Sequence, residues 1–262
     1  MFRNYKDIEQ KIKETYKMSR KYQNIEFYDL MLSQYNTREK KKMNIWDAFD
    51  LLNNFIDNSD PDMELPNIYH LFQSAEAARK DNAEDWFQLT CLLHDLGKIM
   101  YIFGNDDTGT SVKQQWAIVG DTFILGCQIP DTIVFPEYNI LNKDHQKYDN
   151  YGIYSRHCGL EKCKISWGHD EFLYRTLKNN ENTLPPQAYY IIRYHSLYLW
   201  HSKNEYSHFE NIYDTIMKPT VQRFNNYDLY SKENTKNKNI HELKEYYQKI
   251  FSKYFKNNDL YF

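Results

Sequence analysis

The chain has 262 residues, of which 33 are Lys or Arg and 36 are Asp or Glu, so its net charge is −3. This length is ample for a sizeable hydrophobic core, and without repeats or long linkers we expect one domain over residues 1–262. Because acidic and basic residues are interspersed, the sequence gives no electrostatic basis for binding nucleic acid or a membrane surface. No apolar run is long enough to span a bilayer, and no secretory signal follows Met1. Four scattered cysteines are typical of free thiols, so we expect a reduced, cytoplasmic protein.

Helical periodicity is common and strand alternation is scarce, which predicts a mainly α fold. The first half of the chain should contain helices over residues 5–21, 25–34, 45–56, 66–80 and 85–95. A polar turn at residues 57–61 should separate the third helix from the fourth. Asp85 is the expected N-cap of the fifth helix, and Gly97 its expected stop.

The middle of the chain is less regular than either end. We expect an exposed polar loop over residues 104–115, and then turns up to residue 165 with a short strand at 117–119. Helical spacing returns at Trp167 and again after Pro185, and a further helix carries Val221 and Phe224. A closing helix should cover residues 240–255, after the charged, Asn-rich stretch 231–239.

His94 and Asp95 stand side by side at the end of an apolar run, where a core helix would place leucines. His94 shares a helical face with Phe87 and Cys91, which predicts that it is buried. A buried carboxylate is costly unless it is paired, hydrogen-bonded or bound to a metal. This dipeptide alone is equally well explained by an aspartate that accepts a hydrogen bond at a helix end.

Further polar residues occupy inward or pocket-facing positions on separate predicted helices. Together with His94 and Asp95 they form a set of six residues on five predicted helices: His70, His94, Asp95, His169, His195 and Asp228. One buried histidine is usually a hydrogen-bonded core residue, but four together with two carboxylates favour a metal site. Such ligands suit iron, manganese or zinc, and inward-facing helical ligands can form a two-metal core. Asp95 could bridge two ions, and the lack of thiols in the set disfavours a structural zinc site.

Lys98 follows Asp95 by three residues and therefore projects over the same helical face. It could hold an oxyanion or a polyol hydroxyl beside the metals, or it could simply compensate the helix dipole. The five other histidines are expected at the surface or behind the ligands: His145, His157, His201, His208 and His241.

The order His…His-Asp…Asp resembles the HD-domain superfamily, and longer motifs resemble the myo-inositol oxygenase family more specifically. These motifs run in order along nearly the whole chain, at residues 2–5, 57–62, 92–98, 116–122, 157–160, 166–171, 184–201 and 224–230. The resemblance implies a helical HD-type fold with its metal site in the helical core. It further implies a mixed-valent di-iron enzyme that uses O2 to cleave myo-inositol to D-glucuronate, without an organic cofactor and as a monomer.

The same resemblance assigns roles to individual residues. One iron would be held by His70, His94, Asp95 and Asp228, and Asp95 would bridge to a second iron on His169 and His195. Lys98 and Asp95 would take part in catalysis. Contacts to myo-inositol would come from Arg3, Asp57, Ser59, Lys98, Gly120, Asp121, His195 and Ser196.

The chain departs from the family pattern in the longer loop after Gly104, at Leu199 and in its last four residues. Two other functions would leave a different pattern in the sequence. An HD-domain phosphohydrolase would need more Lys or Arg around the metals to meet phosphate charge. A catalytically inactive metal-binding scaffold would be expected to lack some of the six ligands.

Overall fold

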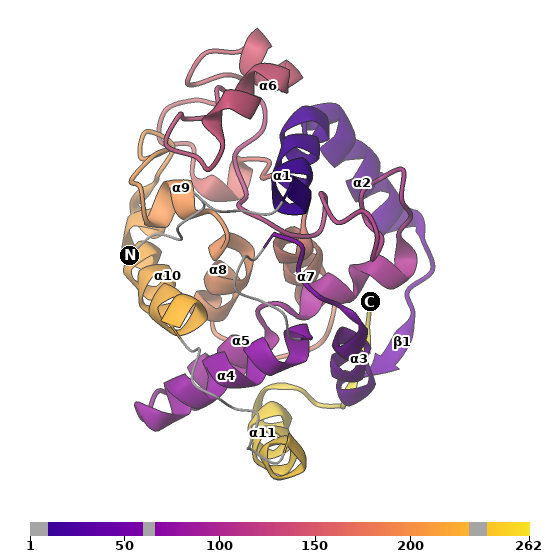
Figure 1. Ribbon diagram of the computed structural model, residues 1–262. Helices are drawn as coiled ribbons and strands as arrows, with labels where there is room; N and C mark the ends of the chain where they lie inside the picture. Colours follow the sequence, from indigo (N-terminus) through magenta and orange to yellow (C-terminus); the bar gives the residue numbers. More distant parts are fainter. Residues whose placement is uncertain (1–9, 60–65, 231–239) are drawn as a thin grey trace.

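The computed structural model describes residues 10–59, 66–230 and 240–262, and this part of the chain is mainly helical, as predicted (Figure 1). Its α-helices are α1 (Gln10–Tyr22), α2 (Ile25–Thr37), α3 (Ile45–Leu51), α4 (Asn67–Lys80), α5 (Asp85–Leu93), α6 (Lys143–Lys147), α7 (His169–Lys178), α8 (Pro186–Tyr194), α9 (Tyr198–His201), α10 (Ile212–Tyr230) and α11 (Ile240–Tyr254). Short 3-10 helices are η1 (Leu52–Asn54), η2 (Leu96–Phe103), η3 (Pro136–Leu141) and η4 (Leu160–Lys162). Strands β1 (Lys42–Asn44) and β2 (Asp259–Tyr261) pair in antiparallel fashion, with Met43 opposite Leu260.

The core helices pack around α5 and α8, which lie near the middle of the molecule (Figure 1). α4 packs along α5, and α8 contacts α5, α7 and α10. The expected apolar stripe of α4, which includes Ile68, Leu71 and Phe72, is buried in this core. Because apolar side chains repeat at helical spacing, each helix can bury one face against its neighbours.

Several predicted boundaries proved wrong. The predicted helix over residues 45–56 ends at Leu51 and continues only as a 3-10 turn. Asp85 is the first residue of α5 rather than its N-cap, a position held by Glu84 without a side-chain cap bond. The strand expected at residues 117–119 is a series of turns, because Ile118 and Val119 bond back to the carbonyl oxygen of Gln115.

Gly97 does not stop a helix, since it lies inside η2. Its importance is steric: a Cβ at this position would lie 2.1 Å from the carbonyl oxygen of His169. Only glycine therefore lets η2 approach the start of α7 so closely. The loop at residues 104–115 is also less exposed than predicted, because Thr110 and Gln115 are buried.

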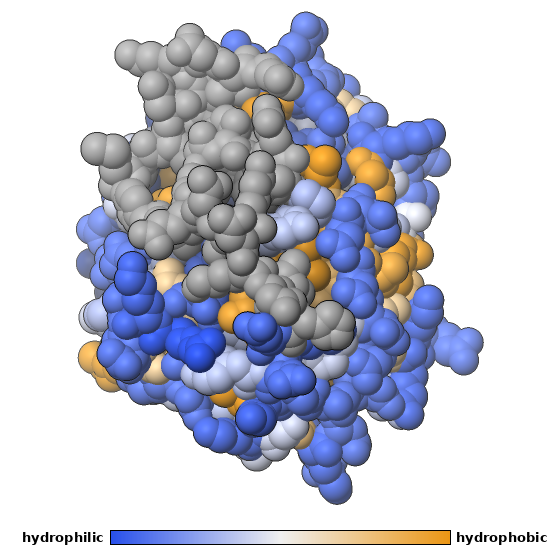
Figure 2. All heavy atoms as spheres, turned by 60° about the horizontal axis from the view of Figure 1, so that its bottom comes forward, coloured by the Kyte–Doolittle hydropathy of each residue, from blue (hydrophilic) through white to orange (hydrophobic). Residues whose placement is uncertain are grey.

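The start of the predicted first helix, residues 5–9, and the whole of residues 231–239 lie outside the described residues, whereas the rest of that helix is α1. Within the described residues, no helix combines the length and apolar character needed to cross a membrane. All four cysteines are free thiols, as predicted. The face in Figure 2 is mainly hydrophilic, with apolar side chains in small scattered groups.

Candidate metal centre

Most of the predicted site residues surround one polar cavity where α4, η2, α7 and α10 converge. The cavity is lined by Asp57, Ser59, Asn67, His70, Asp95, Lys98, Gly120, Asp121, His169, His195, Ser196, Tyr198 and Asp228. His94 is fully buried beside it and contacts the carboxylates of Asp95 and Asp228. Arg3, the remaining predicted residue, lies outside the described residues.

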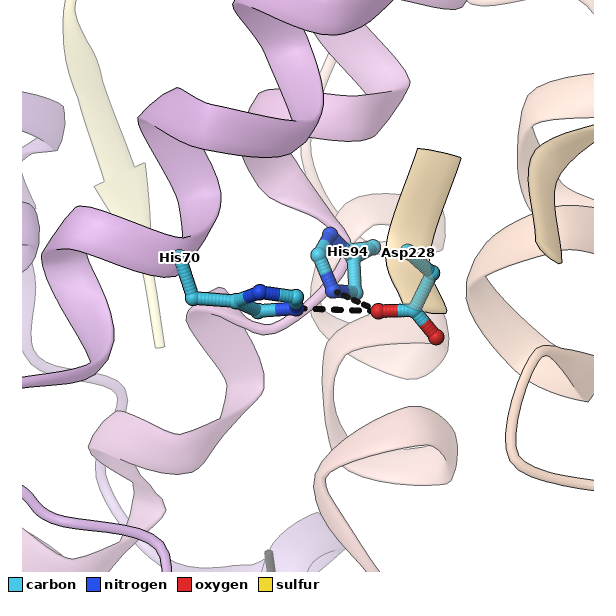
Figure 3. A group of neighbouring side chains, drawn as sticks. All are labelled: His70, His94 and Asp228. Carbon is cyan, nitrogen blue, oxygen red and sulfur yellow. Dashed lines mark hydrogen bonds and ion pairs between the residues drawn. The ribbon is translucent and has the colours of Figure 1, made fainter. Parts of the chain in front are cut away.

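The first group of possible metal ligands consists of His70, His94 and Asp228 (Figure 3). Both imidazoles point at the same carboxylate oxygen of Asp228. Nε2 of His70 lies 2.9 Å and Nε2 of His94 lies 3.3 Å from Oδ1 of Asp228. The three residues come from α4, the end of α5 and α10, so this group forms only when these helices pack together.

The second group lies where α7 begins and α8 ends. Nε2 of His169 is 3.1 Å from Nε2 of His195 and 3.1 Å from Oδ1 of Asp95. Nε2 of His195 is 3.7 Å from the same oxygen of Asp95. Two imidazole nitrogens and a carboxylate oxygen thus face one another in a buried space.

Asp95 joins the two groups, because each of its oxygens faces a different pair of histidines. Oδ1 faces His169 and His195, whereas Oδ2 lies 3.6 Å from Nε2 of His94 and 3.9 Å from Nε2 of His70. Burial alone would raise the pKa of Asp95, but Lys98 and the imidazoles outweigh it and hold this pKa well below its usual range. An ionised carboxylate between two pairs of imidazoles has the geometry of a bridging ligand.

The hydrogen bonds of the imidazoles show that these residues fit metal ions. Nδ1 of His94 lies 2.8 Å from the carbonyl oxygen of Cys91, and Nδ1 of His169 lies 2.6 Å from that of Ile118. Carbonyl oxygens only accept, so we assign the hydrogen to Nδ1 and a lone pair to Nε2 in both rings. Nε2 of His94 is buried without a hydrogen-bond partner. Lone pairs directed at carboxylate oxygens and at each other favour a cation between them.

Lys98 lies on one side of this cluster and is itself buried. Its Nζ lies 2.7 Å from Oδ2 of Asp57, 2.7 Å from Oδ2 of Asp95 and 3.0 Å from Oδ1 of Asn67. Burial would lower the pKa of Lys98, but the two carboxylates outweigh it and raise this pKa above its usual value. The ammonium group is therefore charged and is held beside the bridging carboxylate.

The other predicted substrate-binding residues lie on connecting segments around the cavity. Oδ1 of Asp57 accepts hydrogen bonds from the backbone N–H of Ser59 at 2.7 Å and from its hydroxyl group at 2.6 Å. Gln115, from the long loop, holds this segment through bonds to Ile56 and Asn58. The loop at residues 104–115 thus supports the residues next to Asp57.

Gly120 and Asp121 also line the cavity, in a turn that follows the loop at residues 104–115. Gly120 has a φ of +94°, and a Cβ there would lie 3.2 Å from the ring of Tyr16. The hydroxyl group of Tyr16 donates to Oδ1 of Asp121 at 3.3 Å. Ser196 is attached to the same turn through its carbonyl oxygen, which accepts from the backbone N–H of Thr122 at 2.9 Å.

Sequence reasoning missed three residues of the site. Asn67 donates to Oδ2 of Asp95 at 3.2 Å, and Tyr198 donates to Oδ2 of Asp228 at 3.3 Å. Asp170 contacts both His169 and His195. The sequence offered one signal, because all three lie within three residues of a predicted ligand. Proximity in sequence does not reveal which side chains share a cavity.

The remaining histidines largely follow the prediction. His145, His157 and His208 are half-buried or exposed. His201 is buried behind a predicted ligand, and its Nε2 lies 2.8 Å from the carbonyl oxygen of His195. The side chain of His241 lies outside the described residues.

The helices bring four imidazoles and two carboxylates together at one polar cavity and its wall. The fold and the site therefore define a class: helical proteins with a histidine–aspartate site suited to metal ions. Comparison with known proteins is more specific. The sequence profile described as "Myo-inositol oxygenase" matches residues 9–262.

The similar proteins span the chain almost completely. An inositol oxygenase from Dictyostelium discoideum is 42% identical over 263 residues, covering 98% of this chain and 88% of the relative. Human inositol oxygenase is 39% identical, covering 97% of this chain and 88% of the relative. Inositol oxygenase 1 from Arabidopsis thaliana is 41% identical, covering 93% of this chain and 78% of the relative. The chain belongs to the myo-inositol oxygenase family.

Proposed function

We propose that this chain is an inositol oxygenase, which uses O2 to cleave the ring of myo-inositol and form D-glucuronate. Family membership over nearly the whole chain supports this activity. The single observation that carries the proposal is the position of Asp95, whose two oxygens face two separate pairs of histidines beside a polar cavity. This arrangement suits two metal ions next to a polyol.

The cofactor in this proposal is a pair of iron ions. His70, His94 and Asp228 would hold one, His169 and His195 would hold the other, and Asp95 would bridge them. When bound, the irons supply Lewis acidity toward a substrate hydroxyl group and the redox capacity to use O2. The unpartnered Nε2 of His94 and the close approach of His169 to His195 support these assignments.

The protein's own residues would bind and orient the ring. Carboxylates suit a polyol because each can accept several hydroxyl hydrogen bonds, and Asp57 and Asp121 line the cavity from two separate segments of the chain. Lys98 would act as the catalytic cation, because its charged ammonium group lies beside the bridging carboxylate and stabilises negative charge on a substrate oxygen. The other contacts in the proposal are Arg3, Ser59, Gly120, His195 and Ser196.

The HD-domain phosphohydrolase is not favoured. Among the described residues that line the cavity, Lys98 is the only lysine or arginine. One ammonium group that is shared with two carboxylates can assist a single substrate oxygen, but it does not match the two negative charges of a phosphate monoester. A catalytically inactive scaffold explains the site less well, because the six predicted ligands come together around one cavity.

The proposal extends to the cellular setting and the assembly of the protein. We infer a cytoplasmic monomer with one domain over residues 1–262, whose partners are myo-inositol and O2 and which binds neither membrane nor nucleic acid. Four free cysteines and a mostly hydrophilic face support this inference (Figure 2).

An activity assay with two substrate classes tests the proposed function. Purified protein loaded with iron is incubated with myo-inositol, in air and under argon, and with a panel of phosphate esters. We expect D-glucuronate only in air and no release of inorganic phosphate. Phosphate release without an oxygen requirement, from protein that carries two irons, would contradict the proposal and favour the phosphohydrolase.

A further inference from the structure

Asp170 lies next to the candidate metal centre, although neither the sequence motifs nor the proposed function gives it a role. It is the second residue of α7 and only 1% exposed. Its Oδ1 contacts three residues of the site: Nδ1 of His195 at 3.0 Å, Nε2 of His169 at 3.2 Å and the hydroxyl group of Ser196 at 3.2 Å. Its Oδ2 is buried without a hydrogen-bond partner among the described residues.

An ordinary structural role explains this carboxylate poorly. An acidic residue in the first turn of a helix can stabilise the helix dipole or bond to free backbone N–H groups. Asp170 makes no such capping bond in α7; its side chain instead contacts His169, His195 and Ser196, which all belong to the site. A fully buried carboxylate with one oxygen unpaired is costly, so its position calls for a compensating partner.

The surroundings of His195 indicate what Asp170 does. Every near neighbour of Nδ1 is an acceptor: Oδ1 of Asp170 and the carbonyl oxygens of Ile191 at 3.3 Å and Ile192 at 3.1 Å. Nδ1 of His195 must therefore carry a hydrogen, which leaves Nε2 to face His169 and Asp95. The other two fully buried ligand candidates, His94 and His169, bond through Nδ1 to a carbonyl oxygen alone.

We propose that Asp170 is a positioning residue that fixes the orientation and tautomer of His195 and holds the hydroxyl group of Ser196 at the cavity. A carboxylate that accepts from the Nδ1–H of a histidine makes the opposite nitrogen a better metal ligand. The same oxygen would thereby link the second metal position to a substrate contact. This inference rests on the proposed function, because it assigns His195 to the second iron.

Replacement of the carboxylate by an amide separates this role from packing. Asp170→Asn keeps the shape of the side chain and removes its charge. Asp214→Asn is the matched control, because Asp214 is also fully buried and accepts from Leu160, Asn211 and Tyr190, away from the cavity. Iron(II) is titrated anaerobically into each protein against a chelator, which gives separate dissociation constants for the two ions.

We expect the second dissociation constant to rise 10- to 100-fold in Asp170→Asn, while the first ion binds normally and Asp214→Asn binds both as the wild type does. If the second iron binds Asp170→Asn as tightly as it binds the wild type, the role proposed for Asp170 is wrong, while the proposed function still stands. Fewer than two irons in the wild type would overturn the proposed function together with it.

A second measurement does not depend on whether the variant folds. Zinc-loaded wild-type protein labelled with 15N-histidine should show a slowly exchanging proton on Nδ1 of His195, with a downfield shift typical of a bond to a carboxylate. An unprotonated Nδ1 at His195 would overturn the proposal.

Discussion

Lys98→Met should strongly destabilise the metal-free protein. In the folded chain the Lys98 ammonium group is 2.7 Å from carboxylate oxygens of both Asp57 and Asp95, and all three side chains are less than 10% exposed. Removing one partner of a buried ion pair leaves an uncompensated buried charge and costs about 3–5 kcal/mol. Here two carboxylates lose the same cation, so we expect the free energy of unfolding to fall by an amount near the upper end of this range. The total stability of a typical domain is only about 5–15 kcal/mol.

Urea denaturation of chelator-treated protein measures this loss as a change in the free energy of unfolding. The control is Lys164→Met, because Lys164 pairs with Asp29 at 2.7 Å but both side chains are substantially exposed. Such an exposed pair contributes about 0–1 kcal/mol. If Lys98→Met loses no more stability than Lys164→Met does, the argument that Lys98 compensates buried carboxylates is wrong.

Four further substitutions test other parts of the site and its frame. Asp95→Ala should abolish binding of both irons, whereas Asp228→Ala should lose only the first, as measured by iron content per chain. Glu171→Gln should lower the free energy of unfolding by about 3 kcal/mol at pH 7, because Arg193 pairs with Glu171 at 2.8 Å. Urea denaturation measures this change. Gly97→Ala should lose about 1–3 kcal/mol and weaken iron binding, because its Cβ would meet the start of α7.

The Glu171 prediction also has a definite pH dependence. Burial would raise the pKa of Glu171, but Arg193 and Arg175 outweigh it and hold this pKa below the ordinary value of 4.5. A group with a lowered folded-state pKa stabilises the protein above its unfolded pKa and loses that contribution as the pH falls through the folded value. The difference in the free energy of unfolding between the wild type and Glu171→Gln should therefore be largest at pH 7 and shrink below about pH 4.5.

Certain results would contradict these predictions. Two irons retained in Asp95→Ala would refute the bridge, and loss of both in Asp228→Ala would refute the separate positions. A stability difference for Glu171→Gln that grows on acidification would show that the ion pair is not its source. Unchanged stability in Gly97→Ala would mean that η2 can move away from His169 at no cost.

The sequence predicted the helices better than their ends. Apolar residues at helical spacing reveal a buried face, which is why α4 and α7 appeared where expected. Boundaries depend on contacts with distant segments: the turns at residues 117–119 exist because Ile118 bonds to Gln115 and to His169, which lies far away in the sequence. Gly97 shows the same limit, because its lack of a side chain matters only beside α7.

The candidate site was largely predictable because its chemistry conflicts with its position. Histidines and aspartates on apolar helical faces, such as His94 and Asp228, stand out against the pattern around them. Asn67, Asp170 and Tyr198 were missed because polar residues near helix ends are ordinary, and only the packing of α4, α7 and α10 shows that they meet the same cavity. The sequence likewise does not show that each oxygen of Asp95 faces a different pair of histidines, because this follows only from the distances between these atoms in the folded chain.

Oxygen labelling tests the central claim most directly. Conversion of myo-inositol, C6H12O6, with O2 to D-glucuronic acid, C6H10O7, and water adds one oxygen atom to the product, and an oxygenase takes this atom from O2. The iron-loaded protein is therefore supplied with 18O2 and myo-inositol, and the product is weighed by mass spectrometry. We expect D-glucuronate that carries one 18O atom. Unlabelled product, or no D-glucuronate from protein with two irons bound, would contradict the account.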